Sequence, residues 1–100
     1  MNIRIENTHP TPIVHISGRI DTLTAGQLEE QLLPLITESC PSIILNCENV
    51  DYISSTGLRV FILADKKTHA CNGTISIAGL SDFLKEVFDV SGLTDLFTFV

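Results

Sequence analysis

The stretch DYISSTGLRVF, Asp51–Phe61, joins the two patterns that decide the fold. Upstream of it, Ser42–Cys47 (SIILNC) is an apolar run typical of a central strand buried on both faces. Downstream, Thr56–Ala70 carries its apolar residues at helical spacing. Residues 48–53 are then a loop or a short extension of the strand. The stretch therefore predicts a strand followed by a helix, with the hydroxyl cluster, Ser54–Thr56, at the junction.

Two segments with alternating polarity precede this unit. In Asn2–Asn7, isoleucines alternate with polar residues, and the alternation resumes in Ile13–Ser17. Thr8–Pro12 contains two prolines and predicts a turn between them. The two segments therefore predict a β-hairpin, with Gly18 closing its far end.

A first helix is expected after the hairpin. Thr24 and Gln27 form a capping-box pattern, which predicts the helix start. The expected buried face consists of Leu28, Leu32, Leu35 and Ile36. Pro34 removes a backbone donor and predicts a kink, and Pro41 is expected to end the helix.

The last third of the sequence repeats the strand and helix pattern. Asn72–Gly73 is a stop signal for the second helix, and Thr74–Ala78 is a short apolar strand. Ser81 is expected to cap a third helix that stops at Gly92, and Leu93–Val100 is an apolar tail. A hairpin followed by βαβα units predicts an α/β domain over residues 1–100, with a mixed sheet and helices packed on it.

Composition narrows the function. Six basic residues against twelve acidic ones give a net charge of -6, which disfavours nucleic-acid binding. The absence of a long apolar run or a basic, then apolar, N-terminus leads us to expect a cytoplasmic protein without membrane contact. Three cysteines and three histidines show no metal-ligand spacing, so no metal site is expected. Cys47 is expected to be a core residue.

The hydroxyl cluster has a structural and several functional interpretations. One of the hydroxyls can cap the helix, because Ser and Thr are favoured N-caps. Gly57, directly after the cluster, costs helix stability and indicates a close approach at that point. A serine nucleophile lacks the Gly-x-Ser-x-Gly pattern, and a phosphate cradle lacks a glycine-rich loop with lysine. Phosphorylation fits best, because a helix N-terminus tolerates an added phosphate.

Four segments in order resemble the STAS domain family, in particular the bacterial anti-sigma factor antagonists. They are GRIDTLTA (Gly18–Ala25), the stretch Ile43–Phe61, GTISIAGL (Gly73–Leu80) and VFDVSGLTDLF (Val87–Phe97). The resemblance spans nearly the whole chain. Ser54 departs from the pattern, because the family often has aspartate there.

The resemblance implies a regulatory binding protein and not an enzyme. It also implies no cofactor, because ATP and Mg²⁺ would belong to the partner kinase. The family's phosphorylated serine corresponds to Ser55, with Ser54 and Thr56 as the alternative acceptors. Without phosphate, the protein would bind a serine-kinase anti-sigma factor and release a sigma factor, and a PP2C-type phosphatase would reset it. The implied partner-binding residues are Asp21, Thr22, Thr24, Ser54, Ser55, Thr56, Gly57 and Arg59. The alternatives are a STAS module that regulates a non-sigma complex and, from the enzyme class, a small serine hydrolase.

Overall fold

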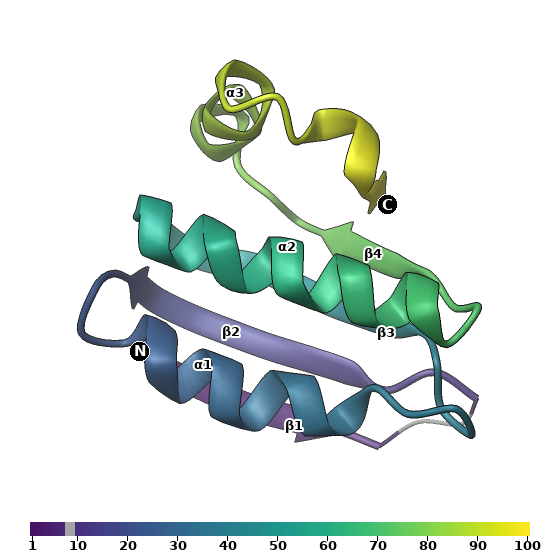
Figure 1. Ribbon diagram of the computed structural model, residues 1–100. Coiled ribbons are helices and arrows are strands. Elements are labelled where there is room, and N and C mark those ends of the chain that lie inside the picture. The colour runs from purple at the N-terminus through teal and green to yellow at the C-terminus, as the bar shows by residue number, and fades with distance from the viewer. Residues whose placement is uncertain (8–9) are drawn as a thin grey trace.

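A mixed five-stranded sheet in the order β1-β2-β3-β4-β5 forms the centre of the molecule (Figure 1). The computed structural model describes residues 1–7 and 10–100. The strands are β1 (Asn2–Glu6), β2 (Ile13–Ile20), β3 (Ile43–Ile53), β4 (Ile75–Ala78) and β5 (Thr98–Phe99). The helices are α1 (Ala25–Leu32), α2 (Ser55–Ala70) and α3 (Asp82–Val90), with short 3-10 helices η1 (Leu33–Leu35) and η2 (Thr94–Leu96).

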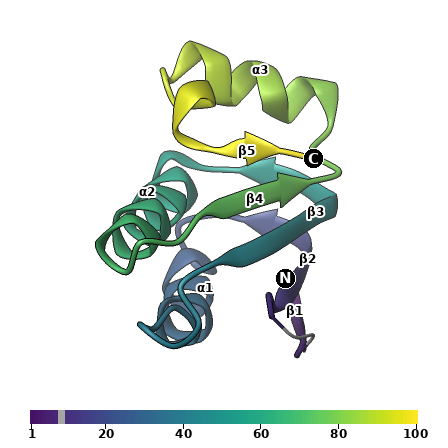
Figure 2. The same cartoon turned by 90° about the vertical axis from the view of Figure 1, so that its right-hand side faces the viewer.

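The sheet combines one antiparallel pair with three parallel ones. β1 and β2 form the expected antiparallel hairpin, and β2, β3, β4 and β5 pair in parallel. α1 and α2 lie on the same side of the sheet, and α3 lies at the β5 end (Figure 2). The predicted α/β class, the mixed sheet and the helices packed on it are therefore confirmed. The predicted turn includes residues 8 and 9, which lie outside the described residues.

β3 differs from the prediction of a strand buried on both faces. It runs through Ile53, so the segment after Cys47 extends the strand. Ile43, Leu45 and Cys47 are buried, whereas Ile44 and Asn46 are only half-buried. The prediction of two buried faces is wrong because α1 and α2 cover the same side of the sheet. Burial raises the pKa of the Cys47 thiol to about 12, as expected for a core cysteine.

The two ends of the first crossover also differ from the prediction. β2 continues past Gly18 to Ile20, because Gly18 adopts a φ of +93° beside a register shift and the strand resumes after it. α1 ends at Leu32, well before Pro41. Pro34 lies in η1, where its missing N–H costs less than inside an α-helix.

The C-terminal tail forms structure that the sequence did not predict. Residues 98 and 99 add the short strand β5 beside β4. Phe97 and Phe99 pack edge-to-face against Phe88, at 5.7 and 6.1 Å between ring centroids. Phe61 of α2 contacts the same cluster, 5.7 Å from Phe88. These aromatic contacts fix α3 and the tail onto α2 and the sheet.

Gly57 lies where α2 meets the ends of two strands. A Cβ at this position would lie 2.7 Å from Ile20 Cγ2, 2.9 Å from Ile53 Cγ1 and 3.1 Å from the Ile20 carbonyl oxygen. The close approach that the glycine indicated is therefore made by the chain's own strands. Gly26 in α1 is different, because nothing lies within 4 Å of a Cβ built there.

These two glycines form a matched pair for a stability test. Gly26→Ala should stabilise the protein by about 0.5–1 kcal/mol, the ordinary gain in helix propensity. Gly57→Ala should destabilise it by about 1–3 kcal/mol, because overpacking against Ile20 outweighs the same gain. Urea unfolding of both variants measures the difference. Equal stabilisation by both substitutions would contradict the packing of α2 described here.

Candidate partner-binding site

The site is formed where β2 and β3 end side by side. Ile20 and Ile53 are register partners in parallel strands, so the residues after them leave the same edge of the sheet. The backbone N–H of Ser54 donates to the Ile20 carbonyl, with 2.8 Å between N and O. This bond joins the hydroxyl cluster to the Asp21 turn, Asp21–Thr24. The structure thus brings together two segments that lie some thirty residues apart in the sequence.

Within the hydroxyl cluster, Ser54 is the helix cap. Its backbone is extended, with φ -87° and ψ 170°, and its Oγ accepts a hydrogen bond from the Gly57 N–H at 3.1 Å. Its carbonyl accepts from the Leu58 N–H at 2.9 Å. The structural interpretation of the cluster therefore applies to this one residue. Aspartate is an equally favoured N-cap, so the departure from the family pattern preserves the capping geometry.

The other two hydroxyls are free of this structural task. Ser55 and Thr56 are exposed and occupy the first two positions of α2, whereas Ser54 is half-buried. The N-terminus of a helix carries a partial positive charge and unpaired N–H groups. An anion attached to Ser55 or Thr56 would therefore lie in a favourable field. The geometry suits a modification site better than a helix interior would.

The Asp21 turn is held by its own side chains. One carboxylate oxygen of Asp21 accepts from the N–H groups of Leu23 and Thr24, at 3.0 and 3.1 Å. The Thr24 hydroxyl donates to the Arg19 carbonyl and accepts from the Asp21 N–H, each at 2.9 Å. The predicted capping box is wrong, because this hydroxyl bonds backward into the turn and makes no bond to the first turn of α1.

Ionisation of Asp21 is coupled to this turn. Desolvation opposes the charged form, but the hydrogen bonds from Thr24 and Leu23 and the nearby Arg19 outweigh it, so that the pKa of Asp21 is lowered. The Arg19 Nε lies 3.8 Å from the carboxylate. Thr22 and Leu23 at the tip of the turn are exposed, and the Leu23 side chain is 91% accessible. The sequence did not single out Leu23 as an exposed apolar side chain between two threonines.

A shallow groove separates the first turns of α1 and α2. It has a volume of about 240 Å³ and is lined by Ala25, Gly26, Glu29, Thr56, Arg59 and Val60. Arg59, a residue predicted to contact the partner, lies on α2 and is exposed. Glu29 lines the same groove from α1, and the sequence did not single it out. Sequence spacing cannot pair these residues, because they come from separate helices.

The predicted site residues fall into two groups. Asp21, Thr24, Ser54 and Gly57 support the backbone at the site: the first three through hydrogen bonds and Gly57 through its buried packing. The exposed group consists of Thr22, Ser55, Thr56 and Arg59. The sequence also did not reveal a cation–π contact between Arg19 and Tyr52. The guanidinium carbon of Arg19 lies 4.1 Å from the centroid of the Tyr52 ring.

The described histidines are engaged elsewhere. His15 Nε2 lies 2.9 Å from the Glu6 carboxylate, and its Nδ1 lies 2.9 Å from the Asn46 amide nitrogen. His69 lies near the other end of α2, 3.7 Å from Asp65. Over residues 1–7 and 10–100, no group of three His, Cys, Asp or Glu side chains could hold a metal ion. Within the same ranges, no helix has the length and apolar character needed to cross a membrane.

Comparisons with known proteins agree with this architecture. The family model described as STAS domain matches residues 2–100. The anti-sigma-B factor antagonist of Staphylococcus aureus (strain NCTC 8325 / PS 47) is 36% identical over 98 residues, which cover 96% of this chain and 91% of the relative.

Solved structures share the fold at lower sequence identity. An anti-sigma factor antagonist from Mycobacterium paratuberculosis superposes with a TM-score of 0.86 at 21% identity, covering 98% of this chain and 83% of the other. The Bacillus cell fate determinant SpoIIAA in its phosphorylated form gives a TM-score of 0.77 at 21% identity, with coverages of 99% and 91%. On the match along its whole length, the chain belongs to the STAS domain family.

Proposed function

We propose that the protein is an anti-sigma factor antagonist whose partner binding is switched by phosphorylation of Ser55. Without phosphate it binds a serine-kinase anti-sigma factor, and the sigma factor is released. The kinase then phosphorylates Ser55 and the complex dissociates. A PP2C-type phosphatase restores the binding form, and ATP and Mg²⁺ belong to the kinase. The observation that carries the proposal is the exposed Ser55 hydroxyl at the start of α2, beside the Asp21 turn.

The division of tasks between Ser54 and Ser55 supports this choice of acceptor. Ser54 is half-buried and its oxygen holds the Gly57 N–H, so phosphorylating it would disturb the helix cap. Ser55 is exposed, so a kinase can reach it without opening the fold. Thr56 is also exposed but lines the groove beside α1. Ser55 is the acceptor that leaves both the cap and the groove undisturbed.

The effect of the phosphate is local. It adds a charge of about -1.5 to -2 and considerable bulk at the tip of α2. The helix N-terminus compensates part of that charge within the protein itself. A partner that covers Ser55 together with Thr22 and Arg59 meets the phosphate charge at close range. The partner's acidic or apolar groups then lose contact with this surface. The switch therefore acts on the interface while the fold persists.

Substitutions at Ser55 test the proposal directly. Ser55→Ala should bind a purified serine-kinase anti-sigma factor as the wild type does and take up no phosphate. Ser55→Glu should weaken that binding about tenfold or more, because it places a charge under the partner. Calorimetry or surface plasmon resonance measures both affinities, and intact mass with phosphosite mapping after incubation with ATP measures the phosphate.

A matched control separates local from general charge effects. Gln31→Glu introduces the same side chain on the exposed side of α1, near its C-terminal end, and should leave the affinity unchanged. Thermal unfolding should show that Ser55→Glu stays folded. A phosphate that persists in Ser55→Ala would move the switch to Ser54 or Thr56. Binding that ATP never reverses would leave a constitutive STAS module.

The Asp21 turn provides a pH-dependent prediction. The pKa of the Asp21 carboxyl is lowered in the folded protein. The carboxylate therefore stabilises the turn fully at pH values above its ordinary pKa of 3.8, and this stabilisation is lost as the pH falls through the lowered pKa. NMR should therefore show the Leu23 and Thr24 amide signals moving together in that acidic range. Asp21→Ala should abolish that movement and weaken partner binding at neutral pH, whereas Asp95→Ala should do neither. If the Leu23 and Thr24 amide signals do not shift as Asp21 titrates, Asp21 does not hold the turn.

A further inference from the structure

The outward face of α3 carries an apolar stripe in addition to its buried face. The α3 stripe consists of Phe83, Val87 and Val90, which share one side of the helix at spacings of four and three residues. Phe83 is 64% accessible and Val90 82%, and Val87 is half-buried between them. Leu84 and Phe88, on a neighbouring side of α3, are buried in the core, and Val87 also packs against that core. The exposed ends of the α3 stripe, Phe83 and Val90, are therefore not needed to hold the helix on the sheet.

The stripe is continuous and slightly concave. A hollow of about 350 Å³ is lined by Phe83, Glu86, Val87, Val90 and Ser91. Along the helix axis the stripe spans roughly 10 Å, or two turns. Isolated exposed apolar residues are common on protein surfaces, but a rimmed apolar hollow is typical of an interaction site.

The C-terminal segment that carries the α3 stripe is strongly acidic. Residues 81–100 contain four acidic side chains and one basic one, a net charge of -3 out of -6 for the whole chain. The acidic residues are Asp82, Glu86, Asp89 and Asp95, and the basic one is Lys85. One fifth of the sequence thus holds half of the net negative charge. Such a surface repels phosphate backbones and anionic lipid headgroups and attracts lysine and arginine.

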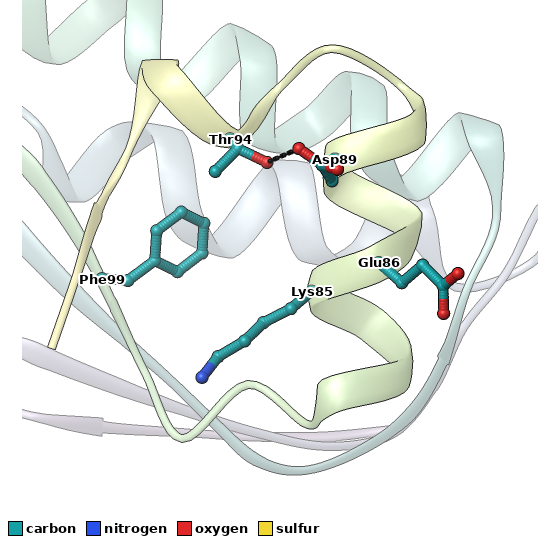
Figure 3. Close-up of a pocket in the computed structure, with 5 residues that line it drawn as sticks. All are labelled: Lys85, Glu86, Asp89, Thr94 and Phe99. Atoms are coloured by element: carbon teal, nitrogen blue, oxygen red, sulfur yellow. Dashed lines mark hydrogen bonds between the residues drawn. The ribbon is translucent and has the colours of Figure 1, made fainter.

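The single lysine does not neutralise the stripe. Figure 3 shows Lys85 extending toward the Phe99 side of α3, whereas Glu86 projects from the other side. Lys85 and Phe99 line a second hollow of about 470 Å³, together with Glu86, Asp89 and Thr94. Asp89 accepts a hydrogen bond from the Thr94 hydroxyl at 3.3 Å on that side. Glu86 is thus the acidic residue that lines the hollow of the stripe itself.

We propose that the α3 stripe is a docking surface for a cationic amphipathic helix of a partner protein. A two-turn apolar stripe on one helix accepts the apolar ridge of a second helix, with anchors at the same three- and four-residue spacing. The acidic rim selects lysine and arginine on the flanks of that helix and sets its orientation. This surface is separate from the Ser55 switch, so the inference does not depend on the proposed function.

A designed peptide tests the chemistry. The probe is a labelled helix of about 15 residues, the length at which isolated helices become stable, with leucines on one face and lysines on the other. A second peptide has the same composition with the leucines scattered around the helix. Fluorescence anisotropy with the full chain at physiological salt measures both affinities, and NMR amide shifts map the contact. We expect the amphipathic peptide to bind at least tenfold tighter, with shifts centred on residues 82–91.

Surface variants test the location. Val90→Ser should weaken binding of the amphipathic peptide about tenfold, because Val90 is the most exposed apolar side chain of the stripe. Glu86→Gln should weaken it a few-fold, whereas Glu30→Gln on α1, with the same change of charge, should leave it unchanged. Both glutamates are exposed, and far-UV circular dichroism verifies that each variant folds. Equal affinity for the two peptides, equal effects of the two glutamate substitutions, or amide shifts outside α3 would each overturn the proposal.

Discussion

The short bond between the Ser54 N–H and the Ile20 carbonyl is the contact on which the candidate site depends. It closes the end of the β2–β3 pair, and the hydroxyl cluster and the Asp21 turn leave the sheet from that point. Gly57 reinforces it, because the first turn of α2 can rest on Ile20 only where no Cβ intervenes. Backbone groups therefore connect the two segments, and the surface side chains around this contact can change with little effect on the fold. A site held by its backbone is well suited to reversible modification.

The overall fold and the position of the hydroxyl cluster could be predicted from local patterns. Alternation in β1 and β2, the helical periodicity of α2 and the cap at Ser81 each act within a few residues, and all three are confirmed. The junction at Ser54–Thr56 was also visible, because a hydroxyl run between a strand and a helix has few structural interpretations. Family resemblance then added the choice of Ser55 within that run.

What sequence reasoning missed depends on contacts across the fold. β5 has two residues, too few for any alternation, and exists because the phenylalanines at its ends pack on Phe61 and Phe88. The Thr24 hydroxyl matched a capping-box pattern but bonds to the Arg19 carbonyl, a group that the turn brings near. Glu29 and Arg59 line one groove, and that arrangement depends on how α1 and α2 pack. Neither the turn nor the helix packing leaves a periodic signal in the sequence.

The net charge of the chain implies that the proposed switch at Ser55 would act by direct contact. The chain already has a net charge of -6, so one phosphate changes its long-range field only modestly. At physiological salt the Debye length is about 8 Å, and exposed charges farther apart than that are largely screened. Discrimination must then come from groups that the partner places directly over the start of α2. There the phosphate meets a desolvated surface, and the acidic background of the rest of the protein contributes equally to both states. The switch therefore needs an exposed acceptor at the centre of the interface, and among the hydroxyls of the cluster Ser55 meets that requirement while Ser54 holds the cap.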